Sequence, residues 1–269
     1  MKQHTQLLTT LASLGITLGA TNAASVSVNL HLNTNDANMV DADETVFNGV
    51  TGAESISGAN ANNVSIVGIS TTTAGAINTN LVDQSGAASG VNLTYTDTGF
   101  TAFSNNSSPN QAATGNGGLG QSSLYMNTTE TLNLSGLAAF APSGYSLILI
   151  FDSSNEHGGR NYGFAVNDGG GVQTLFTNDT NARDADTNDD GLFDLIAAVG
   201  TTAGTATTDA NFATYSGLTG NTLSITSAAG TTGRSPLAGF QIVANPVPEP
   251  SSIALLGMGG LALTFRRRK

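Results

Sequence analysis

Apolar and polar residues alternate in short runs along the middle of the chain, and turns rich in Gly, Asn and Asp separate these runs. The clearest run is residues 26–32, Val-Ser-Val-Asn-Leu-His-Leu, in which every second residue is apolar. A period of two is typical of a β-strand that buries one face and exposes the other. Similar but less regular runs predict further strands at residues 64–69, 91–95, 123–126, 131–134, 161–166, 172–176, 193–199, 222–226 and 237–243.

One run, residues 146–151, is apolar throughout after its first serine (Ser-Leu-Ile-Leu-Ile-Phe). Because it has no polar face, we expect a central strand that is buried on both sides. About eleven strands with turn-rich links predict an all-β fold, in which two antiparallel sheets pack as a jelly-roll-like sandwich. The long polar stretches 33–60 and 102–120 are predicted to be surface loops.

The first 24 residues have the features of a secretory signal peptide. Lys2 provides a positive start, residues 7–18 are mostly apolar, and small residues precede a predicted cut after Ala23 or Ala24. The alternative is an N-terminal membrane anchor, which is less favoured because the stretch is short and rich in Thr and Gly.

The last 24 residues form a second, different signal. Pro248, Glu249 and Pro250 make a stiff spacer, residues 253–265 are apolar and uncharged, and a basic cluster ends the chain. The cluster contains Arg266, Arg267, Arg268 and Lys269. A helix over this run would be about 22 Å long, short of a hydrocarbon core of roughly 30 Å, so the bilayer would have to thin around a short transmembrane helix. The alternative is a buried helix of the folded domain, which four adjacent cations disfavour.

This order of proline-containing spacer, short apolar helix and arginine cluster resembles the PEP-CTERM sorting signal of Gram-negative bacteria. The resemblance implies export through the Sec translocon, transient anchoring in the inner membrane, and removal of the tail by an exosortase. It also implies a final location at the cell surface or in an extracellular, biofilm-type matrix of exopolysaccharide. The predicted organisation is therefore a signal peptide at 1–24, a sandwich at 25–245 and a sorting signal at 246–269.

The charge of the predicted sandwich limits its partners. The chain has a net charge of −11, and its central part has no Lys and only Arg160, Arg183 and Arg234 as cations. Nucleic acids and anionic lipids need Lys and Arg to neutralise phosphate, so we expect neither as a partner of the sandwich. The chain has no Cys, so disulfides do not hold it. An acidic surface does suit divalent cations.

One acidic segment has the spacing of a calcium loop. Ca²⁺ prefers six to eight oxygen ligands in a tight turn, and Gly191 would allow that turn. The candidate ligands are Asp184, Asp186, Asn188, Asp190, the backbone carbonyl of Leu192, and Asp194. Ala197 occupies the position where an EF-hand has a bidentate acid, so a complete EF-hand is not expected. The alternative is a solvated acidic turn, since Asp and Asn favour turns.

A second polar segment, residues 152–160, contains Glu156 and His157, which would suit an acid–base pair. The segment lacks a nucleophile elbow and further zinc ligands, so we favour a polar hairpin loop. Sugar sites usually stack the ligand on Trp or Tyr, but the chain has no Trp and its tyrosines are scattered.

Two functional hypotheses follow. The preferred one is a non-enzymatic surface or matrix protein that is sorted by an exosortase and associates with exopolysaccharide. The alternative is a secreted polysaccharide-binding module or a hydrolase or lyase that acts on polysaccharide. An aromatic-lined groove with two facing carboxylates would favour the enzyme, whereas filled sandwich faces and a single acidic loop would favour the matrix protein.

Overall fold

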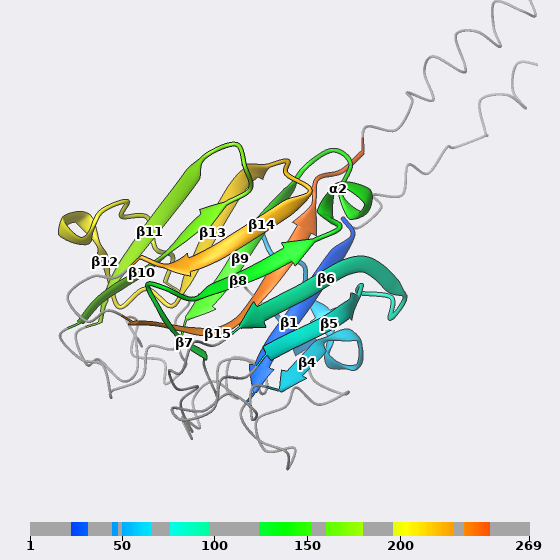
Figure 1. Cartoon of the computed structure of the whole chain (residues 1–269), viewed down its shortest axis with the longest axis horizontal. Coiled ribbons are helices and arrows are strands. Elements are labelled where there is room, and N and C mark those ends of the chain that lie inside the picture. Colours follow the sequence, from blue (N-terminus) through cyan, green and yellow to red (C-terminus); the bar gives the residue numbers. More distant parts are fainter. Residues whose placement is uncertain are drawn as a thin grey trace, which may run out of the picture.

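The computed structural model describes residues 23–31, 45–47, 50–65, 76–96, 124–151, 160–179, 196–228 and 234–247. These residues are mostly β-structure, with two large sheets stacked so that β6, β8 and β14 cross over β1 and β15 (Figure 1). In spatial order, the six-stranded sheet contains β13 (Phe212–Leu218), β9 (Tyr145–Phe151), β15 (Arg234–Ala244), β1 (Ser25–His31) and β4 (Asn62–Ser65), with β7 (Leu124–Asn127) also paired to β15.

The second large sheet has seven strands. Its order is β12 (Thr207–Thr208), β11 (Val172–Asp179), β10 (Arg160–Asn167), β14 (Thr222–Ser227), β8 (Thr131–Ser135), β6 (Ala88–Thr96) and β5 (Ala76–Val82). Smaller elements are a hairpin of β2 (Thr45–Val46) and β3 (Ile56–Ser57) and the single helical turns η1 (Gly58–Asn60), α2 (Leu137–Phe140) and η4 (Ala203–Thr205). Pairing between described strands is antiparallel except for β1 with β4 and β11 with β12.

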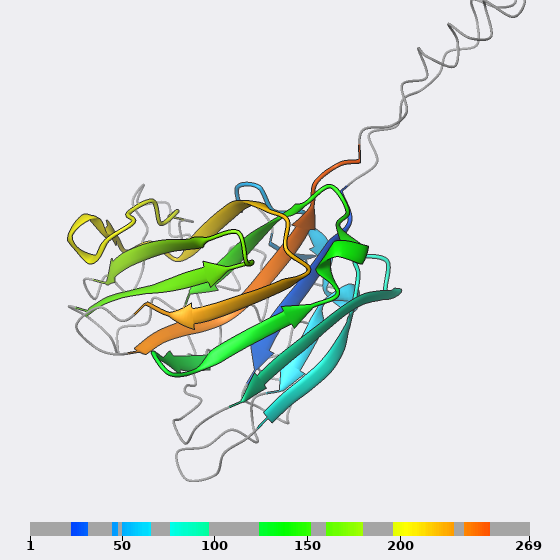
Figure 2. The same cartoon turned by 45° about the horizontal axis from the view of Figure 1, so that its top comes forward.

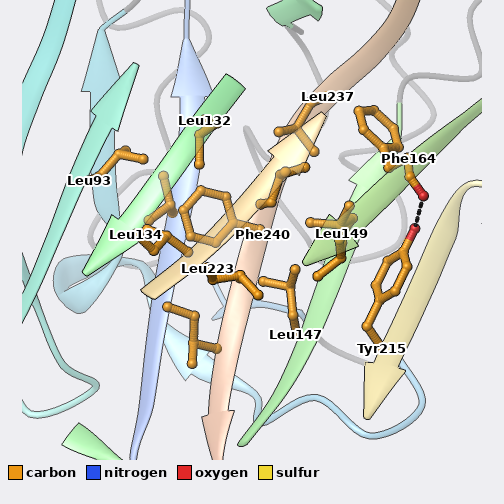
Figure 3. Close-up of a cluster of buried hydrophobic side chains, with 14 of the residues drawn as sticks. Leu93, Leu132, Leu134, Leu147, Leu149, Phe164, Tyr215, Leu223, Leu237 and Phe240 are labelled. Carbon is orange, nitrogen blue, oxygen red and sulfur yellow. Dashed lines mark hydrogen bonds between the residues drawn. The ribbon is translucent and has the colours of Figure 1, made fainter. Parts of the chain in front are cut away.

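An apolar core lies between the two sheets (Figure 3). Leu149 and Phe240 enter it from the six-stranded sheet, and Leu134 and Leu223 enter it from the seven-stranded sheet, each almost completely buried. A fully buried side chain of this kind contributes roughly 1.5–3 kcal/mol. The apolar core therefore provides the stability that disulfides provide in other small exported domains.

The strand β9 is buried on both faces, as its uninterrupted apolar run predicts. Leu147 and Leu149 face the core between the sheets, whereas Ile148 and Ile150 belong to a second cluster on the outer face. That cluster is completed by residues from one distant segment and two neighbouring strands: Val46, Phe47, Val50, Ile56, Phe212, Ala238 and Val243.

The expectation of a surface loop at residues 33–60 is therefore wrong for its described part. Residues 45–47 and 50–61, the covering segment, lie on the outer face of the six-stranded sheet. Gln241, which is fully buried, joins them to the sheet: its Nε2 donates to the backbone oxygen of Glu54 at 2.7 Å, and its Oε1 accepts the backbone N–H of Glu54 at 2.8 Å. The sequence pattern does not predict that this segment packs on the sheet, because few of its residues are apolar and their spacing is irregular.

Most of the predicted strands are confirmed, and three stretches differ from the prediction. Residues 196–200 form only isolated bridges, at Ala197 and Gly200, instead of the predicted strand. The strand β13 escapes prediction because its register shifts between Tyr215 and Leu218, which breaks the alternation. The strand β5 escapes because Asn residues, which are depleted in strands, fill its outward positions.

Two finer predictions on the fold are left open. The jelly-roll class remains a prediction, since the structure establishes two large, mainly antiparallel sheets but not that connectivity. Within the described ranges no helix is long and apolar enough to cross a membrane. The predicted signal-peptide helix and C-terminal transmembrane helix, like the predicted loop at 102–120, lie outside those ranges.

Candidate functional site

The outer face of the seven-stranded sheet carries polar side chains that are half-buried or exposed, and Figure 2 shows no described strand lying over it. Along β6, β8 and β14, Leu and Ile point into the core, so the alternate residues must point outward. We call the resulting surface the polar face. Its residues are Asn78, Asn80, Asn92, Thr94, Thr131, Asn133, Ser135, Asn167, Thr222, Ser224 and Thr226. All of them are carboxamides or alcohols, and none carries a charge.

Strand register arranges these side chains in rows that run across the sheet. The middle row follows the pairs Asn78 with Thr94, Thr94 with Asn133, Asn133 with Ser224 and Ser224 with Asn167. Neighbouring strands are about 4.8 Å apart, so a row over five strands is roughly 19 Å long. Two shorter rows flank it: Asn80, Asn92, Ser135 and Thr222 on one side, and Thr131, Thr226, Ala165 and Thr174 on the other.

Hydrogen bonds hold one corner of the polar face in place. The Asn92 Nδ2 donates to Asn78 Oδ1 at 3.1 Å, to Asn80 Oδ1 at 3.2 Å and to the backbone oxygen of Thr79 at 3.1 Å. These bonds engage only the Oδ1 atoms of Asn78 and Asn80, so they do not consume the N–H donors of these two exposed side chains. The corner is thus ordered while its donors still face solvent.

Apolar residues border the polar face at β11. Val172, which pairs with Asn167, is 63% exposed. Phe176 pairs with Gly163, and a Cβ atom at that glycine would lie 2.8 Å from Cδ1 of the Phe176 ring. Glycine is therefore required for the ring to lie against the strand.

Two of the described acids are held in turns between consecutive strands. Asp83, between β5 and β6, accepts hydrogen bonds from the Ser85 hydroxyl at 2.6 Å and from two backbone N–H groups. Glu130, between β7 and β8, accepts from the backbone and side-chain nitrogens of Asn127, both at 2.9 Å. Each carboxylate is thus bonded within its own turn, and the two do not form the facing pair that a glycosidase needs.

Asp168 joins the β10–β11 hairpin to the turn between β13 and β14 at the end of the polar face. It follows β10, and its Oδ2 accepts the backbone N–H of Thr219 at 2.8 Å and that of Gly220 at 3.1 Å. These bonds, with Thr219 first, hold the pKa of Asp168 below its usual value. The hydrogen bond from the Ser85 hydroxyl has the same effect on the pKa of Asp83.

The five tyrosines of the chain all lie in the described ranges, and all are buried. They are Tyr95, Tyr125, Tyr145, Tyr162 and Tyr215. Burial raises the pKa of Tyr145 and Tyr215, and the Tyr215 hydroxyl donates to the backbone oxygen of Phe164 at 2.8 Å (Figure 3). No tyrosine is available as a stacking platform for a sugar, and the chain has no Trp.

Most of the residues predicted from the sequence as sites lie outside the described ranges. They are the calcium candidates Asp184, Asp186, Asn188, Asp190, Leu192 and Asp194, the acid–base candidates Glu156 and His157, and the sorting residues Pro248, Glu249, Pro250, Arg266, Arg267 and Arg268. Among the residues that the structure describes, no group of three or more His, Cys, Asp or Glu side chains is placed to hold a metal ion.

The two ends of the sandwich are neighbours. Ser25 pairs with Val243, and the backbone N–H of Ala244 donates to the oxygen of Ala24 at 2.8 Å. Ala23, the other predicted cleavage residue, accepts a hydrogen bond from Gln84 Nε2 at 3.2 Å. The segment that enters the sandwich and the one that leaves it are therefore held side by side.

Comparison with known protein families assigns the segment that follows. A model described as the PEP-CTERM protein-sorting motif matches residues 246–269. The chain ends in a PEP-CTERM sorting motif. The motif begins directly after Asn245, whose backbone N–H is bonded to Gly144, so it starts where the sandwich stops. A PEP-CTERM motif implies an exported protein that an exosortase processes, as the sequence analysis expects. The other comparisons found no curated protein and no solved structure that is similar to this chain.

Sequence analysis did not identify the polar face. Asn78 and Asn80 lie on β5, which the sequence pattern does not predict, and the remaining residues are outward positions that the pattern does not distinguish from those of any half-buried strand. The sequence does contain a signal: Ile77, Thr79 and Leu81 face inward and alternate with Asn78 and Asn80. Their alternation predicts a strand when Asn is accepted at outward positions.

Proposed function

We propose that this protein is a non-enzymatic component of the cell surface or extracellular matrix that is exported, processed by an exosortase at its PEP-CTERM tail, and retained by association with exopolysaccharide. The observation that carries the proposal is the sorting motif at residues 246–269. A second observation supports it: the N-terminal and C-terminal ends of the sandwich emerge together.

This arrangement suits a body that is tethered to a membrane at both ends during export. A signal peptide and a C-terminal anchor would enter the same bilayer from adjacent points, so neither tether would pull a strand out of the sandwich. After both cuts, the body would leave the membrane with its hydrogen bonds intact, including the one between Ala24 and Ala244.

Three of the described acids are engaged in turns, which supports a non-enzymatic role over the alternative of a polysaccharide hydrolase or lyase. Asp83, Glu130 and Asp168 are each bonded within or between turns. A general acid or base needs a carboxylate that reaches the substrate. Incubation of the exported protein with polysaccharide would release reducing ends if the enzyme hypothesis were correct, and we expect none.

Mass spectrometry of the protein recovered from the cell surface tests the sorting step. We expect no peptide from residues 253–269 in the wild-type protein. Replacement of Pro248, Glu249 and Pro250 by Ala should leave the tail intact and the protein in the membrane fraction. Replacement of Arg266, Arg267 and Arg268 by Lys is the matched control, because it keeps the cytoplasmic charge. An intact tail on exported wild-type protein would contradict the proposal.

A further inference from the structure

The polar face is a feature of the described residues to which the sorting function assigns no role. The face on the other side of the sandwich is filled by the covering segment, where Phe47 and Ile56 are buried. In contrast, Asn78, Asn80 and Asn133 are exposed, and no described segment covers them.

The absence of charge on the polar face is selective. The whole chain has 19 acids and 8 bases, yet none of these residues lies among the outward positions of β5, β6, β8 and β14. Asp83, Glu130 and Asp168 are instead placed in turns at the ends of these and neighbouring strands. An anionic polymer would meet no cation on this face and would be repelled by the net charge of −11. A neutral ligand meets neither difficulty.

The spacing of the polar groups suits a long ligand better than a small one. The middle row offers an alcohol or carboxamide on each of five adjacent strands, about 4.8 Å apart. A flat surface cannot enclose a small molecule, but a polymer with regularly repeated hydroxyl groups can bond to many positions at once. When a hydrogen bond to water is replaced by one to a ligand hydroxyl, the net gain in binding free energy is small. Affinity must therefore come from the number of contacts.

The side chains are also ordered before any ligand arrives. Thr side chains have few rotamers, and the three hydrogen bonds of Asn92 restrain it and order its neighbours Asn78 and Asn80. Order of this kind reduces the entropy lost on binding. With Tyr buried and Trp absent, binding must depend on hydrogen bonds, with apolar contact limited to the border at Val172 and Phe176.

We propose that the polar face binds a neutral polysaccharide, which lies across the strands along the rows of Asn, Thr and Ser. This inference rests on the proposed function, since it names the surface and the class of exopolysaccharide by which the exported protein is retained. The ligand is a chain of uncharged sugars whose hydroxyl groups exchange hydrogen bonds with the exposed carboxamides. Affinity for a short oligosaccharide is weak, and affinity for the polymer is higher because contacts repeat along it.

Affinity electrophoresis of the protein purified from exporting cells tests this inference. Gels contain either dextran, as a neutral polymer, or alginate, as an anionic one, and the cell's own neutral polysaccharide fraction is a third probe. The variant Asn78→Ala/Asn133→Ala/Asn167→Ala shortens three exposed side chains of the middle row. The control variant Ser143→Ala/Thr201→Ala/Thr214→Ala shortens three exposed side chains elsewhere.

We expect the wild-type and control proteins to be retarded by at least one neutral polymer and not by alginate, and the face variant to bind about tenfold more weakly. Equal binding by the face variant, retardation by alginate alone, or no retardation by any neutral probe would overturn the inference. Light scattering tests the alternative that a second copy of the chain occupies the polar face. A wild-type dimer that becomes a monomer in the face variant would also overturn the inference. Tail processing is measured separately, so the sorting proposal can hold while this inference fails.

Discussion

Gln241 is the residue whose replacement tests most directly how the covering segment is held. It is fully buried on β15 and forms hydrogen bonds to a segment more than 180 residues away in the sequence. Its Nε2 donates to the Ser27 hydroxyl at 2.8 Å and to the Glu54 oxygen at 2.7 Å, and its Oε1 accepts from the Glu54 nitrogen at 2.8 Å. The substitution Gln241→Ala removes all three bonds.

The expected loss of stability follows from these contacts. A hydrogen bond contributes about 0.5–1.5 kcal/mol net, so three of them correspond to about 3 kcal/mol. The cavity left by the shortened side chain adds to this in Gln241→Ala. The control Gln241→Met fills most of the same volume without the hydrogen bonds. We therefore expect Gln241→Ala to be the less stable of the two, and both to be destabilised by at least about 2 kcal/mol.

Urea unfolding followed by circular dichroism measures the total change, and hydrogen exchange at Glu54 measures the local one. Exchange at the Glu54 amide should become faster in both variants, because its acceptor is lost. A matched exposed substitution, Thr214→Ala, should change neither quantity. If Gln241→Met were as stable as the wild-type protein and Glu54 remained protected, the proposed attachment of the covering segment would be wrong.

Two further predictions concern carboxylates. The lowered pKa of Asp168 means that its stabilising effect is complete above its unfolded pKa of about 3.9 and is lost as pH falls through its lower folded value. The substitution Asp168→Asn should therefore reduce the urea midpoint at pH 7 and have a smaller effect at pH 3; an equal effect at both would exclude the charge as the cause. For the calcium candidates, a chelator should lower the melting temperature of the wild-type protein and not that of Asp190→Ala. If the chelator has no effect on the wild-type protein, residues 184–194 form only a turn.

Local pattern predicted the strands whose side chains alternate or are uniformly apolar. The continuous run at 146–151 correctly indicated burial on both faces of β9, because an apolar side chain on either face must be removed from water. Pattern failed where a local irregularity interrupts the period of two, as at the register shift in β13. It also failed where composition and conformation disagree, as in β5, whose Asn residues are unfavourable in strands in general.

Alternation along a strand shows which side chains share a face, but it contains no information on which strand will be the neighbour. The sequence alone therefore determined the C-terminal sorting motif, the β-class and the inward and outward positions of most strands. Only the tertiary structure decided that Asn78, Thr94, Asn133, Ser224 and Asn167 form one row, because strand order and register depend on contacts between residues far apart in the chain. The same reason applies to the covering segment: the outer face of β9 is apolar and is buried by contacts with residues 45–47 and 50–61, which are distant in the sequence.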